Sequence, residues 1–138
     1  MTAAMERLGD PLRVSGGRDD RRRGQAVRGA VRERAAALVG DPELLDDIEL
    51  MTSEALANAV LHGSGPIGVT VATNGRRLRV EVRDEGPAAA PAEPGRRRTD
   101  HGRGLTVIGA LAADWALERS ETETRLWFEV ELRPRRSG

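Results

Sequence analysis

The hydrophobic pattern of the chain changes its period after about residue 62, and this change limits the folds that the chain can adopt. Apolar residues first recur at the spacing of an α-helix, which begins at Pro42 after an aspartate N-cap and runs to about His62. They then alternate with small or polar residues over 67–71 and 78–82, on either side of an Asn-Gly pair at 74–75. We therefore expect a long helix followed by a β-hairpin with one buried face.

Further helices and strands are expected on both sides of this unit. Residues 25–39 have helical spacing with arginines between the apolar positions, and another helix is expected to begin at Leu105. Residues 114–119 and 124–132 have the pattern of strands joined by a polar turn, and 12–14 that of an edge strand. This order predicts an α+β fold, a two-layer α/β sandwich with a mixed, largely antiparallel sheet and helices on one face.

One domain accounts for most of the 138 residues. We expect a flexible N-terminal tail over 1–23, the domain over 24–132 and a C-terminal tail over 133–138. The segment at about 86–102 contains a run of alanines, three prolines and a run of arginines, and it is long for a plain connection. Because long loops inside a compact domain are often functional, we expect this segment to be a lid.

Composition excludes several classes of function. The chain has 22 basic and 22 acidic residues, and every basic one is arginine, so a phosphate loop that needs a lysine is ruled out. It has no cysteine and therefore no disulfide, thiolate nucleophile or cysteine-based zinc site. With zero net charge, few aromatic residues, no long apolar run and a polar start, we expect a cytoplasmic protein that contacts neither nucleic acid nor membrane directly.

The long helix carries a polar stripe formed by Glu54, Asn58 and His62, which are spaced four residues apart. At 3.6 residues per turn, side chains at this spacing lie above one another on one face. Such an oxygen-rich stripe beside an apolar face can hold a hydrated hard cation such as Mg²⁺ and, through it, a phosphate. The plainer interpretations are a solvated helix edge for the first two residues and a packed histidine for the third.

Two further short motifs follow the helix in sequence. Asp84-Glu85-Gly86 comes directly after the predicted hairpin, and Gly102-Arg103-Gly104 precedes the predicted helix at Leu105. Taken alone, the first is typical of a turn and the second of a flexible helix entry. Their order and spacing relative to the polar stripe make the combination more informative than any one of them.

Together these motifs resemble those of the GHKL ATPase superfamily, which has the Bergerat fold, and most closely those of small anti-sigma-factor serine kinases. The resemblance covers about residues 24–132. Residues 53–63 are similar to the N box of the family, 82–86 to its G1 box and 101–105 to its G2 box. The segment that begins at Thr124 resembles the threonine-containing final strand.

The resemblance implies a role for each residue of the expected site. Asn58 would bind Mg²⁺ through its amide oxygen, and Glu54 would act as the general base or orient the attacking group. Asp84 would accept a hydrogen bond from the adenine amino group, and Thr124 would share a water molecule with it. Gly86 would let the backbone approach the purine closely.

The same resemblance assigns the phosphates to the glycine-rich segment. Gly102 and Gly104 would present backbone N–H groups to them at the start of a helix, where anions are favoured. Arg103 would add positive charge against the γ-phosphate. The implied ligands are therefore ATP and Mg²⁺.

The implied function is that of a protein serine/threonine kinase that regulates transcription. Such a protein sequesters a sigma factor and phosphorylates a serine on an anti-anti-sigma antagonist of the STAS type, and it acts as a homodimer. One alternative is a nucleotide-gated binding module without catalysis, since Ala88 stands where the superfamily often has glycine and Asp100 is acidic where related kinases carry a basic residue. Another is a scaffold that binds no nucleotide.

Overall fold

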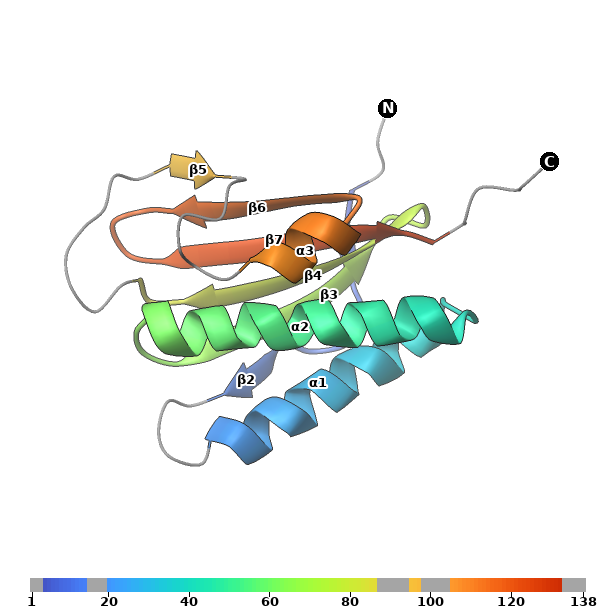
Figure 1. The fold of residues 1–138 in the computed structure, drawn as a ribbon, viewed down its shortest axis with the longest axis horizontal. Coiled ribbons are helices and arrows are strands. Elements are labelled where there is room, and N and C mark those ends of the chain that lie inside the picture. Colours follow the sequence, from blue (N-terminus) through green and yellow to red (C-terminus); the bar gives the residue numbers. More distant parts are fainter. Residues whose placement is uncertain (1–3, 15–19, 87–94, 98–104, 133–138) are drawn as a thin grey trace.

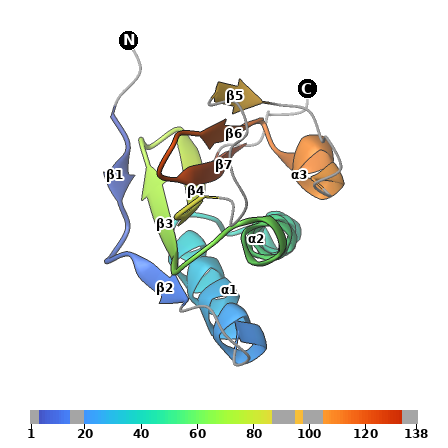
Figure 2. The same ribbon diagram turned by 90° about the vertical axis from the view of Figure 1, so that its left-hand side faces the viewer.

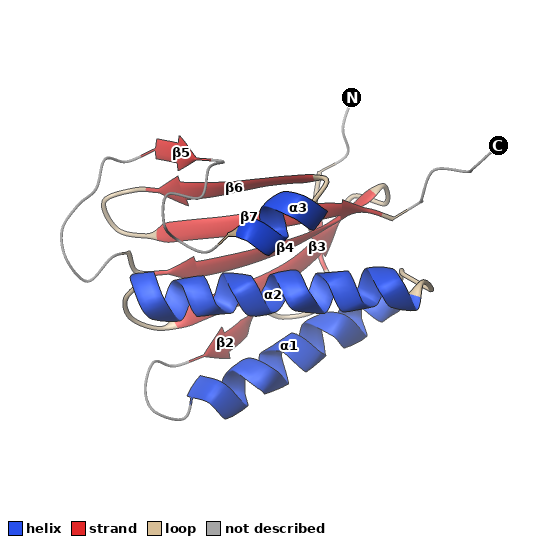
Figure 3. Cartoon of the chain, in the orientation of Figure 1, coloured by secondary structure: helices blue, strands red, loops and turns tan. Residues whose placement is uncertain are grey.

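The computed structural model describes residues 4–14, 20–86, 95–97 and 105–132 of the chain. The helices of this part cover one face of an antiparallel sheet, and the other face of the sheet carries no helix (Figures 1 and 2). Figure 3 shows the same two layers coloured by secondary structure. The predicted α+β sandwich is therefore confirmed.

The sheet has the strand order β1-β3-β4-β7-β6-β5, and β2 also pairs with β3. All strand pairs in the described part are antiparallel, although a partly parallel sheet was expected. The turn at 74–75 joins the two central strands as predicted, with Gly75 at φ +88°. The strands are β1 (Glu6–Arg7), β2 (Leu12–Val14), β3 (Ile67–Thr73), β4 (Arg77–Asp84), β5 (Gly95–Arg97), β6 (Asp114–Arg119) and β7 (Thr124–Glu131).

The helices are α1 (Asp20–Ala36), α2 (Pro42–His62) and α3 (Thr106–Leu111). Asp41 is the N-cap of α2, as the sequence predicts, and its carboxylate accepts a hydrogen bond of 3.0 Å from the Glu43 N–H. At the other end, the Gly63 N–H donates to the Ala59 carbonyl over 2.9 Å. No helix in the described ranges is long and apolar enough to cross a membrane.

A flexible tail was expected over 1–23, but the described residues of this region, 4–14 and 20–23, include strands and the start of a helix. The region contributes β1 and β2 to the sheet edge, and α1 begins at Asp20. Val14 explains part of this order, since it pairs with Ile67 and is buried in the core, and Leu8 donates a backbone hydrogen bond of 2.7 Å to Val71. The two residues of β1 are exposed, so they leave no hydrophobic pattern in the sequence.

The expected lid region contributes one strand to the sheet. This strand, β5, pairs with β6 at the sheet edge. The remainder of the expected lid after Gly86 lies outside the described residues.

The core lies between the helices and the inner face of the sheet. Inward positions of β3, β4 and β7 alternate with outward ones, as the sequence pattern predicts, and α2 packs on them through one face. That buried face fixes the rotation of α2 about its axis and therefore the directions of its polar residues. It consists of Ile48, Met51, Thr52, Ala55, Leu56, Asn58 and Ala59.

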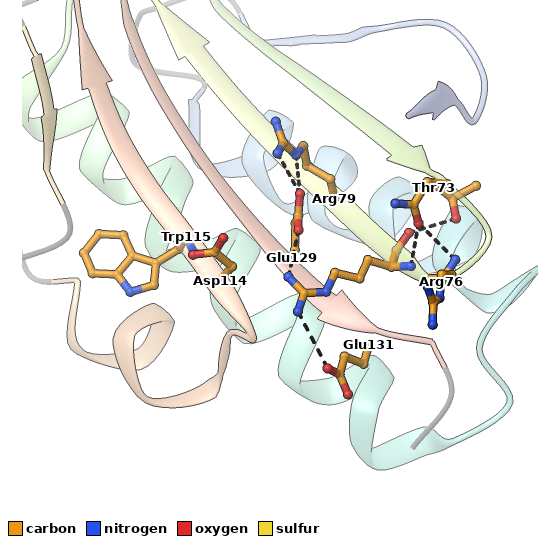
Figure 4. A network of polar contacts seen from close by, with 9 residues as sticks. Thr73, Arg76, Arg79, Asp114, Trp115, Glu129 and Glu131 are labelled. Atoms are coloured by element: carbon orange, nitrogen blue, oxygen red, sulfur yellow. Dashed lines mark hydrogen bonds and ion pairs between the residues drawn. The ribbon is translucent and has the colours of Figure 1, made fainter. Parts of the chain in front are cut away.

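The outer face of the sheet is held by ion pairs rather than by a second apolar layer (Figure 4). Glu129 is buried and lies between Arg79, at 2.7 Å, and Arg77, at 3.2 Å. The Arg79 guanidinium also lies 4.0 Å from the ring centre of Trp127, which is buried on this face. These side chains cover the central strands where no helix does.

Replacement of Asp41 by alanine tests how much the N-cap contributes to α2. Asp41→Ala should lower the free energy of unfolding by about 1 kcal/mol in denaturant titration, because the Glu43 N–H loses its acceptor. Asp41→Asn is the matched control, since asparagine caps equally well and should leave the midpoint nearly unchanged. Equal stability of the alanine variant would show that the cap contributes nothing.

Candidate functional site

Several predicted site residues meet at one end of the sandwich. There the last turn of α2 lies beside the end of β4 and the beginning of β7, and α3 contacts α2 about two turns earlier, at Glu54 (Figure 1). Asp84 is the last residue of β4 and pairs directly with Thr124, the first residue of β7. Both side chains are buried, at 5% and 3% exposure. The inward row of β4 therefore ends in a carboxylate rather than in another apolar residue.

The loop after β4 is fixed by the Asp84 carboxylate. Its Oδ1 accepts a hydrogen bond of 2.7 Å from the Gly86 N–H, and the Glu85 N–H donates to the Ser64 carbonyl over 2.8 Å. Gly86 has φ +98°, a conformation that residues with a Cβ rarely adopt. The predicted Asp-Glu-Gly motif thus forms a tight turn beside the end of α2.

Gly63 makes this arrangement possible, and the sequence analysis included it only as the last residue of the segment that resembles the N box. A Cβ at this position would lie 2.5 Å from the Asp84 carboxyl group and 2.5 Å from the Ala59 carbonyl oxygen. Any residue can adopt its backbone conformation, with φ at −97°. Glycine is therefore required only because a Cβ would overlap these neighbouring atoms. Gly65 is required for a separate reason, because it has φ +72° and a Cβ there would overlap the Glu85 side chain.

Asn58 is a buried polar residue of α2 and lies one turn before the end of this helix. It is 3% exposed, and its Oδ1 accepts no hydrogen bond from any described residue. A buried oxygen without a donor costs about 1–3 kcal/mol, so native proteins seldom keep one without a ligand or water. An amide oxygen of this kind suits a hard cation such as Mg²⁺.

No cluster of three or more histidine or acidic side chains in the described ranges could hold a metal ion. A cation at Asn58 would therefore need most of its ligands from water and from a second molecule. Mg²⁺ is commonly bound in this way, through one or two protein oxygens together with phosphates. The residues present fit a cation that arrives with a phosphate ligand.

Glu54 lies one turn before Asn58 and contacts α3. Its Oε2 accepts a hydrogen bond of 3.1 Å from the Val107 N–H, and its Oε1 accepts one of 2.9 Å from the Ile108 N–H. The sequence analysis assigned Glu54 to catalysis and gave it no structural partner. Glu54 is separated by 53 positions in the sequence from Val107 and by 54 from Ile108, so no local pattern could have revealed these hydrogen bonds.

The other predicted site residues are only partly covered by the structure. His62 is the last residue of α2 and is half-buried. Gly102, Arg103 and Gly104 lie outside the described residues. The structure therefore brings Asn58 to the same end of the fold as the Asp84 pair and leaves the phosphate-binding segment as a prediction.

Replacement of Gly63 by alanine tests the close approach of α2 to Asp84. Gly63→Ala should lower the free energy of unfolding by about 1–3 kcal/mol, because the new Cβ overlaps two oxygen-bearing groups. Gly68→Ala is the matched control, since a Cβ there meets nothing within 4 Å and its backbone is not left-handed. If both variants unfold at the same denaturant concentration as the unmodified protein, the close approach is not a constraint.

Comparison with known proteins identifies the family. The fold is similar to that in the crystal structure of the RsbU and RsbW domains of Rv1364c from Mycobacterium tuberculosis, with 23% identity and a TM-score of 0.62. That match covers 93% of this chain and 34% of the other, so the chain spans about a third of that protein. No curated protein matches the chain. Residues 18–130 match the family described as the histidine kinase-like ATPase domain, and the protein therefore belongs to this family.

Proposed function

We propose that the protein binds Mg-ATP at the end of the sandwich where Asn58 and Asp84 lie, and that it uses ATP as a regulatory protein kinase. Membership of the histidine kinase-like ATPase family implies ATP binding. The observation that carries the location is the buried Asn58 Oδ1, which has no donor or ligand among the described residues.

The Asp84 carboxylate is the proposed acceptor for the adenine amino group. It accepts a hydrogen bond from Gly86, and the two oxygens of a carboxylate together have acceptor positions for several donors. Thr124 lies opposite it on β7 and supplies a hydroxyl that can share a bridging water. The absence of a Cβ at Gly86 leaves room for a flat base beside the turn.

Asn58 is the proposed Mg²⁺ ligand. When bound, Mg²⁺ would neutralise part of the phosphate charge, and the Asn58 oxygen would fix its place on α2. Gly102, Gly104 and Arg103 are proposed phosphate contacts on the strength of the sequence resemblance alone. Glu54 is proposed to take the proton from the hydroxyl that attacks the γ-phosphate.

The proposed substrate of the kinase is a serine on an anti-anti-sigma protein of the STAS type. We propose that the free kinase sequesters a sigma factor, acts as a homodimer in the cytoplasm and thereby regulates transcription. The support is the resemblance of the three boxes to those of anti-sigma-factor kinases. The similarity in fold to a protein with an RsbW domain is consistent with this proposal.

One observation favours a second candidate, a nucleotide-gated binding module without catalysis. Both oxygens of Glu54, the proposed base, accept hydrogen bonds from the backbone of α3. In such a module Glu54 would be structural and ATP would only change partner binding. Incubation with γ-labelled ATP and purified STAS-type proteins separates the candidates, because the kinase transfers label to a serine and the module binds ATP without transfer.

Loss of the Asn58 oxygen should weaken binding of Mg-ATP. Asn58→Ala should reduce the affinity measured by isothermal titration calorimetry by about tenfold or more, and the affinity should become insensitive to Mg²⁺. Asn74→Asp is the control, because Asn74 is the other asparagine of the chain, lies in the β3–β4 turn and keeps an acceptor oxygen when replaced. Unchanged affinity in Asn58→Ala would exclude the proposed metal ligand.

The Asp84 carboxylate should make the site selective for adenine over guanine. Guanine carries a carbonyl oxygen where adenine has its amino group, and two acceptors facing each other repel. The protein should therefore bind ATP at least about tenfold more tightly than GTP, and Asp84→Asn should reduce this ratio toward one. Equal binding of both nucleotides by the unmodified protein would contradict the role of Asp84.

A further inference from the structure

Helix α3 begins without a cap of its own. Its N-cap residue is Leu105, whose apolar side chain is buried and makes no capping hydrogen bond. The first turn also contains no acidic residue. A side chain at the N-cap normally accepts from the N–H groups two and three residues later, which here belong to Val107 and Ile108.

Glu54 supplies this missing cap from α2. Its two carboxylate oxygens accept from those same two N–H groups, at 3.1 Å and 2.9 Å. The contact places a negative charge at the positive end of the α3 dipole. It also satisfies the backbone of Ile108, a residue that is fully buried.

The short length of α3 makes this cap important. A helix of six residues is not stable alone, so its position depends on what anchors its ends. Leu105 and Ile108 anchor it in the core, and α3 otherwise exposes most of its surface, including Leu111 at 41%. The Glu54 carboxylate therefore anchors the first turn of α3 through its polar end.

We propose that Glu54 is a positioning residue that holds the beginning of α3 against α2. It thereby sets the place of Leu105, the N-cap residue of α3, relative to Asn58. The residues directly before Leu105 are the proposed phosphate contacts, so this consequence rests on the proposed function. Glu54 then acts on nucleotide binding through α3 as well as on the proton transfer proposed above.

Hydrogen exchange of the Val107 and Ile108 amides in the nucleotide-free protein tests the cap directly. Glu54→Ala should speed exchange at both amides by about tenfold, and Glu54→Gln should have an intermediate effect because only one side-chain oxygen remains. Ser53→Ala is the matched control. Its hydroxyl accepts from Arg28 on α1, away from α3, and exchange at the two amides should not change. Unchanged exchange in Glu54→Ala would overturn the proposal.

A second variant separates the cap from catalysis. Thr106 is exposed in the first turn of α3, so Thr106→Asp in the Glu54→Ala background restores a carboxylate at this helix end. We expect Glu54→Ala to weaken ATP binding by about fivefold, and Thr106→Asp to recover both the exchange protection and the affinity without restoring phosphate transfer. Faster exchange in Glu54→Ala with unchanged ATP affinity would overturn the positioning role.

The exchange and affinity measurements test the role of Glu54 separately from the proposed function. If the unmodified protein bound no ATP, the proposed function would fail, and the exchange experiment would still decide whether Glu54 caps α3. If ATP bound normally to Glu54→Ala and exchange stayed slow, the positioning role would fail and the nucleotide site would stand.

Discussion

The close packing of the end of α2 against the end of β4 is the constraint on which the candidate site depends. It requires a residue without a Cβ at position 63, because Asp84 occupies the space that a side chain would take. Once this contact is made, the turn at Gly86 lies beside the last turn of the helix. Asp84, the acid at the end of the inward-facing row of β4, is then held at this end of the core.

The rotation of α2 determines what each of its polar residues can do. Because Ile48, Met51 and Ala55 face the sheet, Asn58 is carried into the buried face and Glu54 to the side where α3 lies. One helix thus presents to the interior an amide oxygen that has no donor among the described residues, and presents a carboxylate to a neighbouring helix. The proposed metal ligand and the proposed cap are in this sense consequences of the same hydrophobic packing.

Much of this arrangement could be predicted from the sequence because periodicity reports which face of an element is buried. The bounds of α2, the hairpin and β6 follow from local signals such as the Asp41 cap and the turn at Asn74. Local sequence patterns do not indicate which distant residues contact a given face of a helix or strand. The contact of Glu54 with α3 and the steric role of Gly63 depend on residues distant in sequence, and they appeared only in the folded structure.

The most direct test of the nucleotide site is paramagnetic broadening by Mn²⁺-ATP, observed by nuclear magnetic resonance. If Asn58 holds the metal, its side-chain amide signals should broaden strongly on addition of Mn²⁺-ATP, because relaxation by a bound metal falls steeply with distance. The side-chain signals of Asn74, in the β3–β4 turn at the other end of β4 from Asp84, should stay sharp. Binding of Mn²⁺-ATP that leaves the Asn58 signals unbroadened would contradict the account.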